Sequence, residues 1–215
     1  MTPAEFQAAT RVADDVLDRL RAYVDLLLAW QSRLNLISAA SEADLWRRHV
    51  YDSAQLYPLL PAGARKVLDL GSGAGFPGLV LALMGAPGVH LAESDSRKCR
   101  FLETVSRETS APVTILGERI EALPPQKADV VTARACAPLP RLLGWARPHL
   151  GKGGICLFMK GKKAEEELTD SAKAWTMTVG RIPSLSGGSG VILKIEAITR
   201  KEVRARKGNR PRHDR

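Results

Sequence analysis

The stretch VLDLGSGAGFPG, residues 67–78, decides the fold class of this chain. It joins a short apolar run, which contains the acid Asp69, to glycines at the alternate positions Gly71, Gly73 and Gly75. Glycine lets a backbone approach a ligand more closely than any side chain would allow. Ligands of α/β sheets bind at the carboxyl ends of the strands. The stretch therefore predicts a buried strand that ends at a ligand site.

The spacing of these glycines excludes two common ligands. A phosphate-binding loop needs the pattern GxxxxGK[ST], and no lysine follows the glycines. A dinucleotide fingerprint needs GxGxxG, and Phe76 stands where its third glycine belongs. Pro77 suits the first turn of a helix, whose free N–H groups would favour a carboxylate at least as well as a phosphate. We therefore expect a ligand without a pyrophosphate group.

An acid on the next strand indicates which ligand this is. A second apolar run ends at Glu93, about 20 residues after the first glycine, where an acidic side chain can bind ribose hydroxyls. Asp95 is close enough to take the same role. A ribose at this acid and an amino-acid end near Asp69 and the three glycines are parts of S-adenosylmethionine (SAM). We expect SAM as the cofactor; the alternative is a tight turn that needs glycine only for its geometry.

Strand and helix patterns alternate from residue 66 onward. Apolar and β-branched runs predict strands at 66–70, 89–94, 113–117, 128–134 and 154–161. Runs with helical periodicity predict helices at 77–85, 96–109, 139–150 and 163–175, and residues 179–198 read as a closing hairpin. Such alternation implies an α/β fold, in which a Rossmann-like, mostly parallel sheet has helices on both faces.

The first 62 residues carry helical periodicity and no strand pattern. Apolar residues at helical spacing predict a short helix and a longer one within residues 3–38. A further helical run begins at Ser41, which has capping-box spacing to Asp44, and extends to residue 60. We expect a helical extension (1–62) packed on a core domain (63–200), followed by a basic, mobile tail (201–215).

Composition narrows the class of protein. Apolar residues make up 45% and charged residues 26% of the 215 residues, as in ordinary soluble domains. No apolar run reaches the ~20 residues that a membrane span needs, and the acidic N-terminus is unlike a secretory signal. Cys99, Cys136 and Cys156 lack CxxC spacing, which favours a reducing cytoplasm and no metal site. Residues 200–215 contribute +6 of the net charge of +9. This segment either binds a polyanion or is a solvated end of the chain that makes no contacts.

Several short motifs resemble the RsmG family, also called glucose-inhibited division protein B. They are NLIS (35–38), RHVYDS (48–53), DLGSGAGFPG (69–78), RKCRFL (97–102), RIEAL (119–123), ARACA (133–137) and MKG (159–161). The resemblance implies a class I SAM-dependent methyltransferase fold with an N-terminal helical extension. It also implies methylation of N7 of one guanosine of 16S ribosomal RNA, guanosine 527 in the numbering of that RNA.

The same resemblance implies site residues. It assigns SAM contacts to Gly71, Phe76, Ile120, Glu121 and Arg134. The chain departs from the family pattern at three places. Glu93 stands where the family usually has aspartate, Glu118 can compete with Glu121 for the adenine, and the glycine-rich segment 187–190 lacks a neighbouring basic residue for an RNA contact.

The chemistry of the implied target needs few catalytic groups. Guanine N7 has an in-plane lone pair and no proton, so no general base is required, and a neutral thioether leaves without an acid. Catalysis can then depend largely on positioning. The candidate catalytic residues are Arg134 and Lys160, at the carboxyl ends of the strands 128–134 and 154–161. We expect Arg134 at the boundary between cofactor and guanine and Lys160 on RNA; the alternative for each is a structural salt bridge or cap contact.

The sequence also allows other functions. Cys136 could be the nucleophile of an RNA cytosine-C5 methyltransferase, or a buried inert thiol. The fold could instead serve a nicotinamide oxidoreductase, which Phe76 at the third glycine position disfavours, or a non-catalytic RNA-binding assembly factor, which the intact DLGSGAG motif disfavours. His49 and Asp52, one helical turn apart, are expected either to form a polar pair that supports the substrate pocket or to make a helix-packing hydrogen bond between the helical extension and the sheet domain.

The expected partner is 16S rRNA in the small ribosomal subunit or its assembly intermediate. The basic stretches 97–100 and 160–163 and the tail would contact its phosphates. Sequence-specific recognition of RNA usually needs an unpaired base, so we expect the target guanine to be unpaired. We expect a cytoplasmic monomer without membrane contact.

Overall fold

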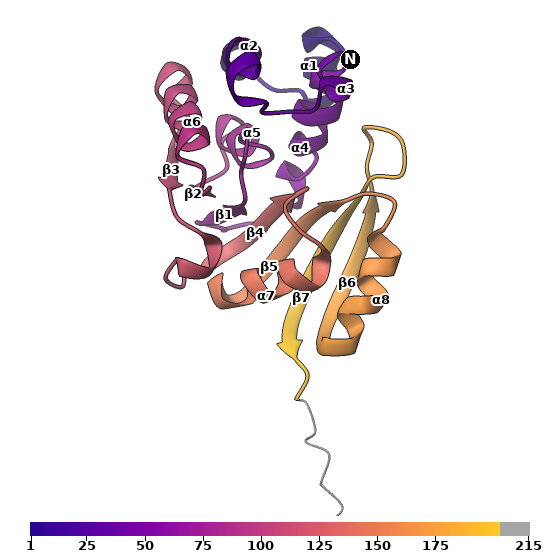
Figure 1. Cartoon of the computed structure of the whole chain (residues 1–215). Coiled ribbons are helices and arrows are strands. Elements are labelled where there is room, and N and C mark those ends of the chain that lie inside the picture. The colour runs from indigo at the N-terminus through magenta and orange to yellow at the C-terminus, as the bar shows by residue number, and fades with distance from the viewer. Residues whose placement is uncertain (203–215) are drawn as a thin grey trace, which may run out of the picture.

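A seven-stranded sheet forms the centre of the computed structural model, which describes residues 1–202 (Figure 1). Within these residues the strand order is β3–β2–β1–β4–β5–β7–β6. The parallel strands are β1 (Val67–Leu70), β2 (Val89–Ala92), β3 (Val113–Leu116), β4 (Ala128–Arg134) and β5 (Leu150–Lys160). β7 (Val191–Arg200) runs antiparallel to β5 and to β6 (Trp175–Pro183), which confirms the predicted hairpin.

Helices cover both faces of the sheet, as the alternation predicts. One face packs against α2 (Asp14–Leu34), α5 (Gly78–Leu83) and α6 (Ser96–Thr109), and the other against α7 (Leu139–Ala146) and α8 (Ala164–Ala174) (Figure 1). Successive strand residues enter opposite cores, so Val67 joins the first cluster of buried residues and Leu68 joins the second. The apolar runs of the central strands are thus explained by burial on both faces.

The strand that departs most from its predicted bounds is β5. It begins at Leu150 rather than at residue 154, because Leu150 pairs with Ala128 of β4. Gly151 and Gly153 lie inside this added part, and glycine has no strand preference. Pairing with a neighbouring strand therefore overrides local propensity here.

The predicted helical run from residue 41 is broken into short pieces. Ser41 lies inside α3 (Ala39–Glu42), and its hydroxyl donates to the Ser38 carbonyl at 2.8 Å. The predicted capping box with Asp44 is therefore wrong. A π-helical segment (Trp46–Tyr51), α4 (Asp52–Ala54) and a 3₁₀ turn (Tyr57–Leu59) follow.

The N-terminal helices share one hydrophobic core with the sheet. In α1 (Pro3–Thr10), Phe6 packs against Trp46 with ring centroids 5.4 Å apart. Tyr23 of α2 lies 5.2 Å from the Phe76 ring, and its hydroxyl donates to the Ala74 carbonyl at 2.5 Å. The extension thus helps to hold the glycine-rich turn. The division at residue 62 stays a prediction.

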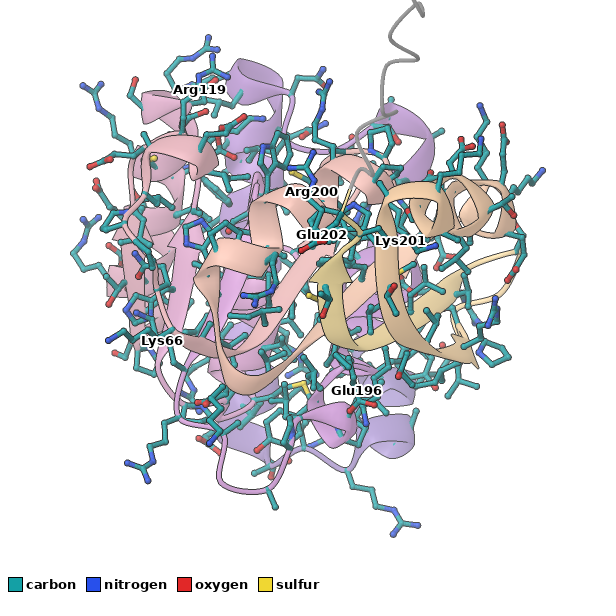
Figure 2. The ribbon with its side chains drawn as sticks, turned by 90° about the horizontal axis from the view of Figure 1, so that it is seen from below. Lys66, Arg119, Glu196, Arg200, Lys201 and Glu202 are labelled. Atoms are coloured by element: carbon teal, nitrogen blue, oxygen red, sulfur yellow. The ribbon has the colours of Figure 1, made fainter. Side chains whose placement is uncertain are left out.

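The described chain ends at the sheet edge where β1, β4 and β5 begin. β7 runs antiparallel to β5, so it starts beside the carboxyl ends of the parallel strands and finishes about 30 Å away, at a rise of ~3.3 Å per residue. Figure 2 shows Arg200, Lys201 and Glu202 grouped where β7 leaves the sheet. Most of the predicted tail, residues 203–215, lies outside the described residues. Within residues 1–202, no helix is both long enough and apolar enough to cross a bilayer.

Candidate functional site

The candidate site lies between β1 and β4, where the order in which the chain adds strands to the sheet changes direction. β1 and β4 are neighbours, while the chain continues from β1 to β2 on one side and from β4 to β5 on the other. Such a switch point opens a crevice at the carboxyl ends of the strands. Two hollows of about 160 Å³ and 340 Å³ occupy it here, and Gly71, Glu93 and Cys136 line both. We call them the first and second hollows.

Gly71 and Gly73 line the second hollow, whereas Gly75 lies behind it. A Cβ atom on Gly71 would come within 2.4 Å of Cys136 Sγ, so this glycine lets the segment after β4 close on the turn after β1. A Cβ atom on Gly75 would come within 2.4 Å of Leu79 Cδ1 and 2.9 Å of Tyr23 Oη. Two of the three predicted cofactor glycines therefore face the crevice, and the third allows helix packing.

Asp69 is fully buried beneath the glycine turn and lines neither hollow. Its Oδ1 accepts from the Thr132 hydroxyl at 2.8 Å, and its Oδ2 accepts from the Gly78 N–H at 3.3 Å. Burial raises the pKa of Asp69 to about 6. The expectation of a free helix N-terminus after Pro77 is wrong, because Pro77 is the residue before α5 and Asp69 occupies the first helical N–H.

Glu93 closes the crevice from the β2 side. Its Oε2 accepts from the Gly73 N–H at 2.9 Å and its Oε1 from the Asp95 N–H at 2.8 Å. Each carboxylate oxygen keeps a further acceptor position for a hydroxyl. Asp95 instead caps α6 through the Arg97 N–H and pairs with the Arg97 side chain. The geometry favours Glu93 over Asp95 as the ribose acid.

The wall opposite Glu93 in the first hollow comes from the segment after β3. Ile120 and Glu121 lie on a single 3₁₀ turn (Ile120–Ala122) and line this hollow, as does Glu118. The competition between the two carboxylates therefore stays open. Trp145 of α7 completes the wall, and no motif in the sequence singles it out.

Arg134 ends β4 and lines the second hollow. Its Nη1 donates to the Arg48 carbonyl at 3.1 Å, and its guanidinium carbon lies 4.8 Å from the centre of the Phe76 ring. Burial lowers the pKa of Arg134, while the charge of Asp52 acts to raise it. Arginine remains a cation under such a shift. Phe76 lines the same hollow, so both predicted residues are brought together there.

His49 stacks on Phe76 rather than pairing with Asp52. The two ring centroids are 5.1 Å apart, and neither His49 nitrogen has a hydrogen-bond partner within residues 1–202. Burial, followed by the charges of Arg134 and Arg48, lowers the pKa of His49 to about 3. The expected polar pair is wrong, because the π-helical winding of Trp46–Tyr51 changes which residues share a face.

Lys160 lies behind the segment after β4. Its Nζ is 2.6 Å from Glu167 Oε2 and donates to the Ala137 carbonyl at 3.0 Å, and its side chain is 9% exposed. Glu167 also accepts from the Leu139 N–H at 2.7 Å. Lys160 lines neither hollow, so an RNA contact by this residue stays a prediction, and the geometry favours the alternative of a structural ion pair.

A third hollow of about 520 Å³ adjoins the crevice across Arg48. Asp44, Arg48, Asp52, Lys162 and residues 186–190 line it. The expectation that the glycine-rich segment 187–190 lacks a basic neighbour is therefore wrong, because Arg48 and Lys162 approach it from other elements. The spacing of residues in the sequence could not predict this hollow, because its lining comes from segments that are distant in the chain.

The sequence of this chain is similar to those of known methyltransferases. The family model for GidB, described as rRNA small subunit methyltransferase G, matches residues 16–192. A relative from Paramagnetospirillum magneticum, named ribosomal RNA small subunit methyltransferase G, is 58% identical over 200 residues, covering 93% of this chain and 98% of the relative. The protein of that name from Rhodospirillum centenum is 50% identical over 194 residues, covering 90% of each chain.

Solved structures show the same fold at low identity. The crystal structure of P. horikoshii TYW2 in complex with MeSAdo matches with a TM-score of 0.55 and 14% identity, covering 70% of this chain and 62% of that one. A SAM-dependent O-methyltransferase from Thermotoga maritima matches with a TM-score of 0.52 and 16% identity, covering 71% and 66%. The chain thus has the class I SAM-dependent methyltransferase fold.

Proposed function

The chain belongs to the GidB family of small-subunit rRNA methyltransferases, and on that premise we propose that it methylates N7 of a guanine in 16S rRNA. The observation that carries the proposal is the crevice at β1 and β4. Two joined hollows there share Gly71, Glu93 and Cys136, and Arg134 connects them through Arg48 to a third hollow. A cofactor and a base can therefore meet at Arg134.

The first two hollows fit SAM. Glu93 offers acceptor positions for ribose hydroxyls, Ile120 and Glu121 border the adenine side, and Gly71, Gly73 and Phe76 border the amino-acid side. Bound SAM would supply a methyl group on a cationic sulfur. Asp69 supports this site from behind, because it fixes Thr132 and the Gly78 N–H.

The residues around Arg134 suit a reaction without proton transfer. Neutral His49 and the cation of Arg134 both lie against Phe76, so the wall of the second hollow is fixed on two sides. Guanine N7 needs no base, and because the pKa of His49 is about 3, this ring is uncharged at neutral pH and does not supply an imidazolium that could protonate N7. Correct alignment alone can lower the barrier by up to about 7–11 kcal/mol.

The alternative that uses Cys136 as a nucleophile is disfavoured by its surroundings. Burial, followed by the charges of Asp69 and Glu93, raises the pKa of the Cys136 thiol to about 11. A thiol with that pKa stays protonated at neutral pH, and the thiolate is the nucleophilic form. Cys136 therefore serves as a wall between Gly71 and the first hollow.

The partner we propose is 16S rRNA in the small subunit or in an assembly intermediate. Lys98 lines the second hollow, and the exposed Arg48 and Lys162 line the third, so cations border both entrances. Phosphate contacts of this kind make binding dependent on salt. A protein that acts on this substrate would work in the cytoplasm, and we propose that it does so as a monomer, since these three hollows are built from one chain.

Methyl transfer from labelled SAM to small subunits from a strain that lacks this activity tests the proposal. Digestion of the RNA and mass spectrometry of its nucleosides should reveal 7-methylguanosine. Label in 5-methylcytidine would support the cysteine mechanism instead. Absence of label, together with tight NAD binding and no SAM binding in calorimetry, would overturn the methyltransferase assignment.

A further inference from the structure

The carboxylate of Asp52 is held from one side only. Ser184 Oγ donates to its Oδ1 at 2.7 Å, Ser186 Oγ at 2.8 Å and Gln55 Nε2 at 3.3 Å. Among residues 1–202, its Oδ2 receives no hydrogen bond, although Asp52 lines the third hollow. Each carboxylate oxygen has its own lone pairs, so Oδ2 stays available to a further donor. The hollow therefore presents a fixed, negatively charged acceptor without a donor.

The third hollow has the size and position of a base-binding site. Its volume of about 520 Å³ lies within the ~300–1,000 Å³ typical of small-molecule sites. Arg48 lines this hollow, and its carbonyl accepts from Arg134, which lines the second hollow. A base between Asp52 and Arg134 would thus reach the edge of the cofactor site.

Guanine matches a carboxylate acceptor at one edge only. Its Watson–Crick edge carries two kinds of donor, the ring N1–H and the exocyclic amine, whereas adenine has an acceptor nitrogen in place of N1–H. Proteins that read unpaired bases use this edge. N7 lies on the opposite side of the purine, so a guanine whose Watson–Crick edge faces Asp52 turns N7 away from it.

We propose that Asp52 Oδ2 accepts hydrogen bonds from the Watson–Crick edge of the target guanine and thereby determines the choice of guanine over adenine. The inference rests on the proposed function, because it places the base that is methylated at N7. Ser184 and Ser186 are positioning residues, which act by fixing Oδ1. Lys162, which lines the same hollow, suits the phosphate of that nucleotide.

The substitution Asp52→Asn tests this role because it keeps size and replaces an acceptor with a donor. Small subunits reconstituted with guanosine or adenosine at the target position are the two substrates. We expect kcat/KM on guanosine to fall about 10- to 100-fold, and the guanosine-to-adenosine ratio to fall by at least as much. SAM affinity in calorimetry should be unchanged, since Asp52 lines neither SAM hollow.

The matched control is Asp44→Asn in the same hollow. Asp44 already pairs with the N-terminal amine at 3.1 Å and with Arg47 at 3.7 Å, so its loss should leave the guanosine-to-adenosine ratio unchanged. The double variant Ser184→Ala/Ser186→Ala removes two donors to Oδ1. It should lower the ratio partly even if Asp52→Asn fails to fold.

The outcomes separate the two proposals. An unchanged ratio in Asp52→Asn, with SAM affinity intact, would overturn the role of Asp52. An unchanged ratio in the double serine variant would overturn it if Asp52→Asn does not fold. The wild-type product decides the proposed function independently, because a nucleoside other than 7-methylguanosine would contradict it whatever the variants do.

Discussion

At the residue scale, Asp69 in β1 and Glu93, which directly follows β2, have different roles. Asp69 is buried beneath the glycine turn with two internal donors, whereas Glu93 lines both the first and the second hollow. The sequence pattern predicts both as cofactor residues, since both belong to strand ends. Only three-dimensional packing separates the acid that holds the turn from the acid that faces the ligand.

Asp69→Asn should change how stability depends on pH. The pKa of Asp69 rises from 3.8 to about 6 on folding, so the folded state binds a proton more tightly than the unfolded state. Its contribution to the free energy of unfolding should therefore fall as pH rises from about 4 to 6, by about 3 kcal/mol in all. Urea unfolding of wild type and variant at pH 4, 5, 6 and 7 measures the difference. If the stability of wild type minus that of Asp69→Asn stays constant or increases from pH 4 to pH 7, the pKa of Asp69 is not raised.

Cys136→Ala should leave catalysis nearly intact. The thiol is protonated at neutral pH because its pKa is about 11, and it contributes only a wall next to Gly71. We expect kcat to stay within about threefold of wild type, since a protonated thiol supplies no nucleophile. Single-turnover methylation of small subunits measures it. A loss of several hundredfold with SAM affinity intact would restore the cysteine mechanism.

At the scale of elements, local signals fail where tertiary contacts or unusual winding take over. The bounds of α6 and β4 follow directly from amphipathic and apolar runs. The run after Ser41 breaks, because π-helical winding replaces a regular helix, and β5 begins early because it pairs with β4. The third hollow could not be predicted, because Asp52 and Ser184 meet only through the packing of separate elements.

The ion pair between β5 and α8 should stabilise the fold. Lys160 and Glu167 are 9% and 19% exposed, and together they bind the Ala137 carbonyl and the Leu139 N–H. Lys160→Met leaves a largely buried carboxylate without its cation, which costs about 3 kcal/mol or more. Urea unfolding should show this loss, and Glu167→Gln should show a similar one. Normal stability of Lys160→Met with strongly reduced methylation would instead support an RNA contact by Lys160.

At the scale of the whole molecule, the candidate site and the end of the described chain lie at opposite edges of the sheet. The hollows at the carboxyl ends of the strands are lined by Arg48, Lys98 and Lys162. Arg200 and Lys201 lie at the opposite edge, where the chain leaves the sheet (Figure 2). The composition predicts a polyanionic partner but not this division. Under the proposed function, Arg48, Lys98 and Lys162 on one side and Arg200 and Lys201 on the other would contact different parts of a large RNA.

Removal of residues 203–215 should weaken RNA binding without changing the chemistry. This segment carries six Lys/Arg and one acid, and the chain enters it at the edge opposite the crevice. We expect lower affinity for small subunits and a shallower dependence of log K on log salt, because fewer counterions are released. Filter binding across a salt series measures both. An unchanged salt slope would show that the tail does not touch RNA.

The central claim is that the methyl group goes to N7 of a guanine positioned at Arg134. Its most direct test is a small subunit reconstituted with 7-deazaguanosine at the target position, which keeps the Watson–Crick edge and replaces N7 with a carbon. We expect this substrate to bind within about twofold of the natural one, because its Watson–Crick edge is intact for Asp52, and we expect no methyl transfer from labelled SAM. Methylation of the 7-deazaguanosine substrate at the natural rate would contradict the claim.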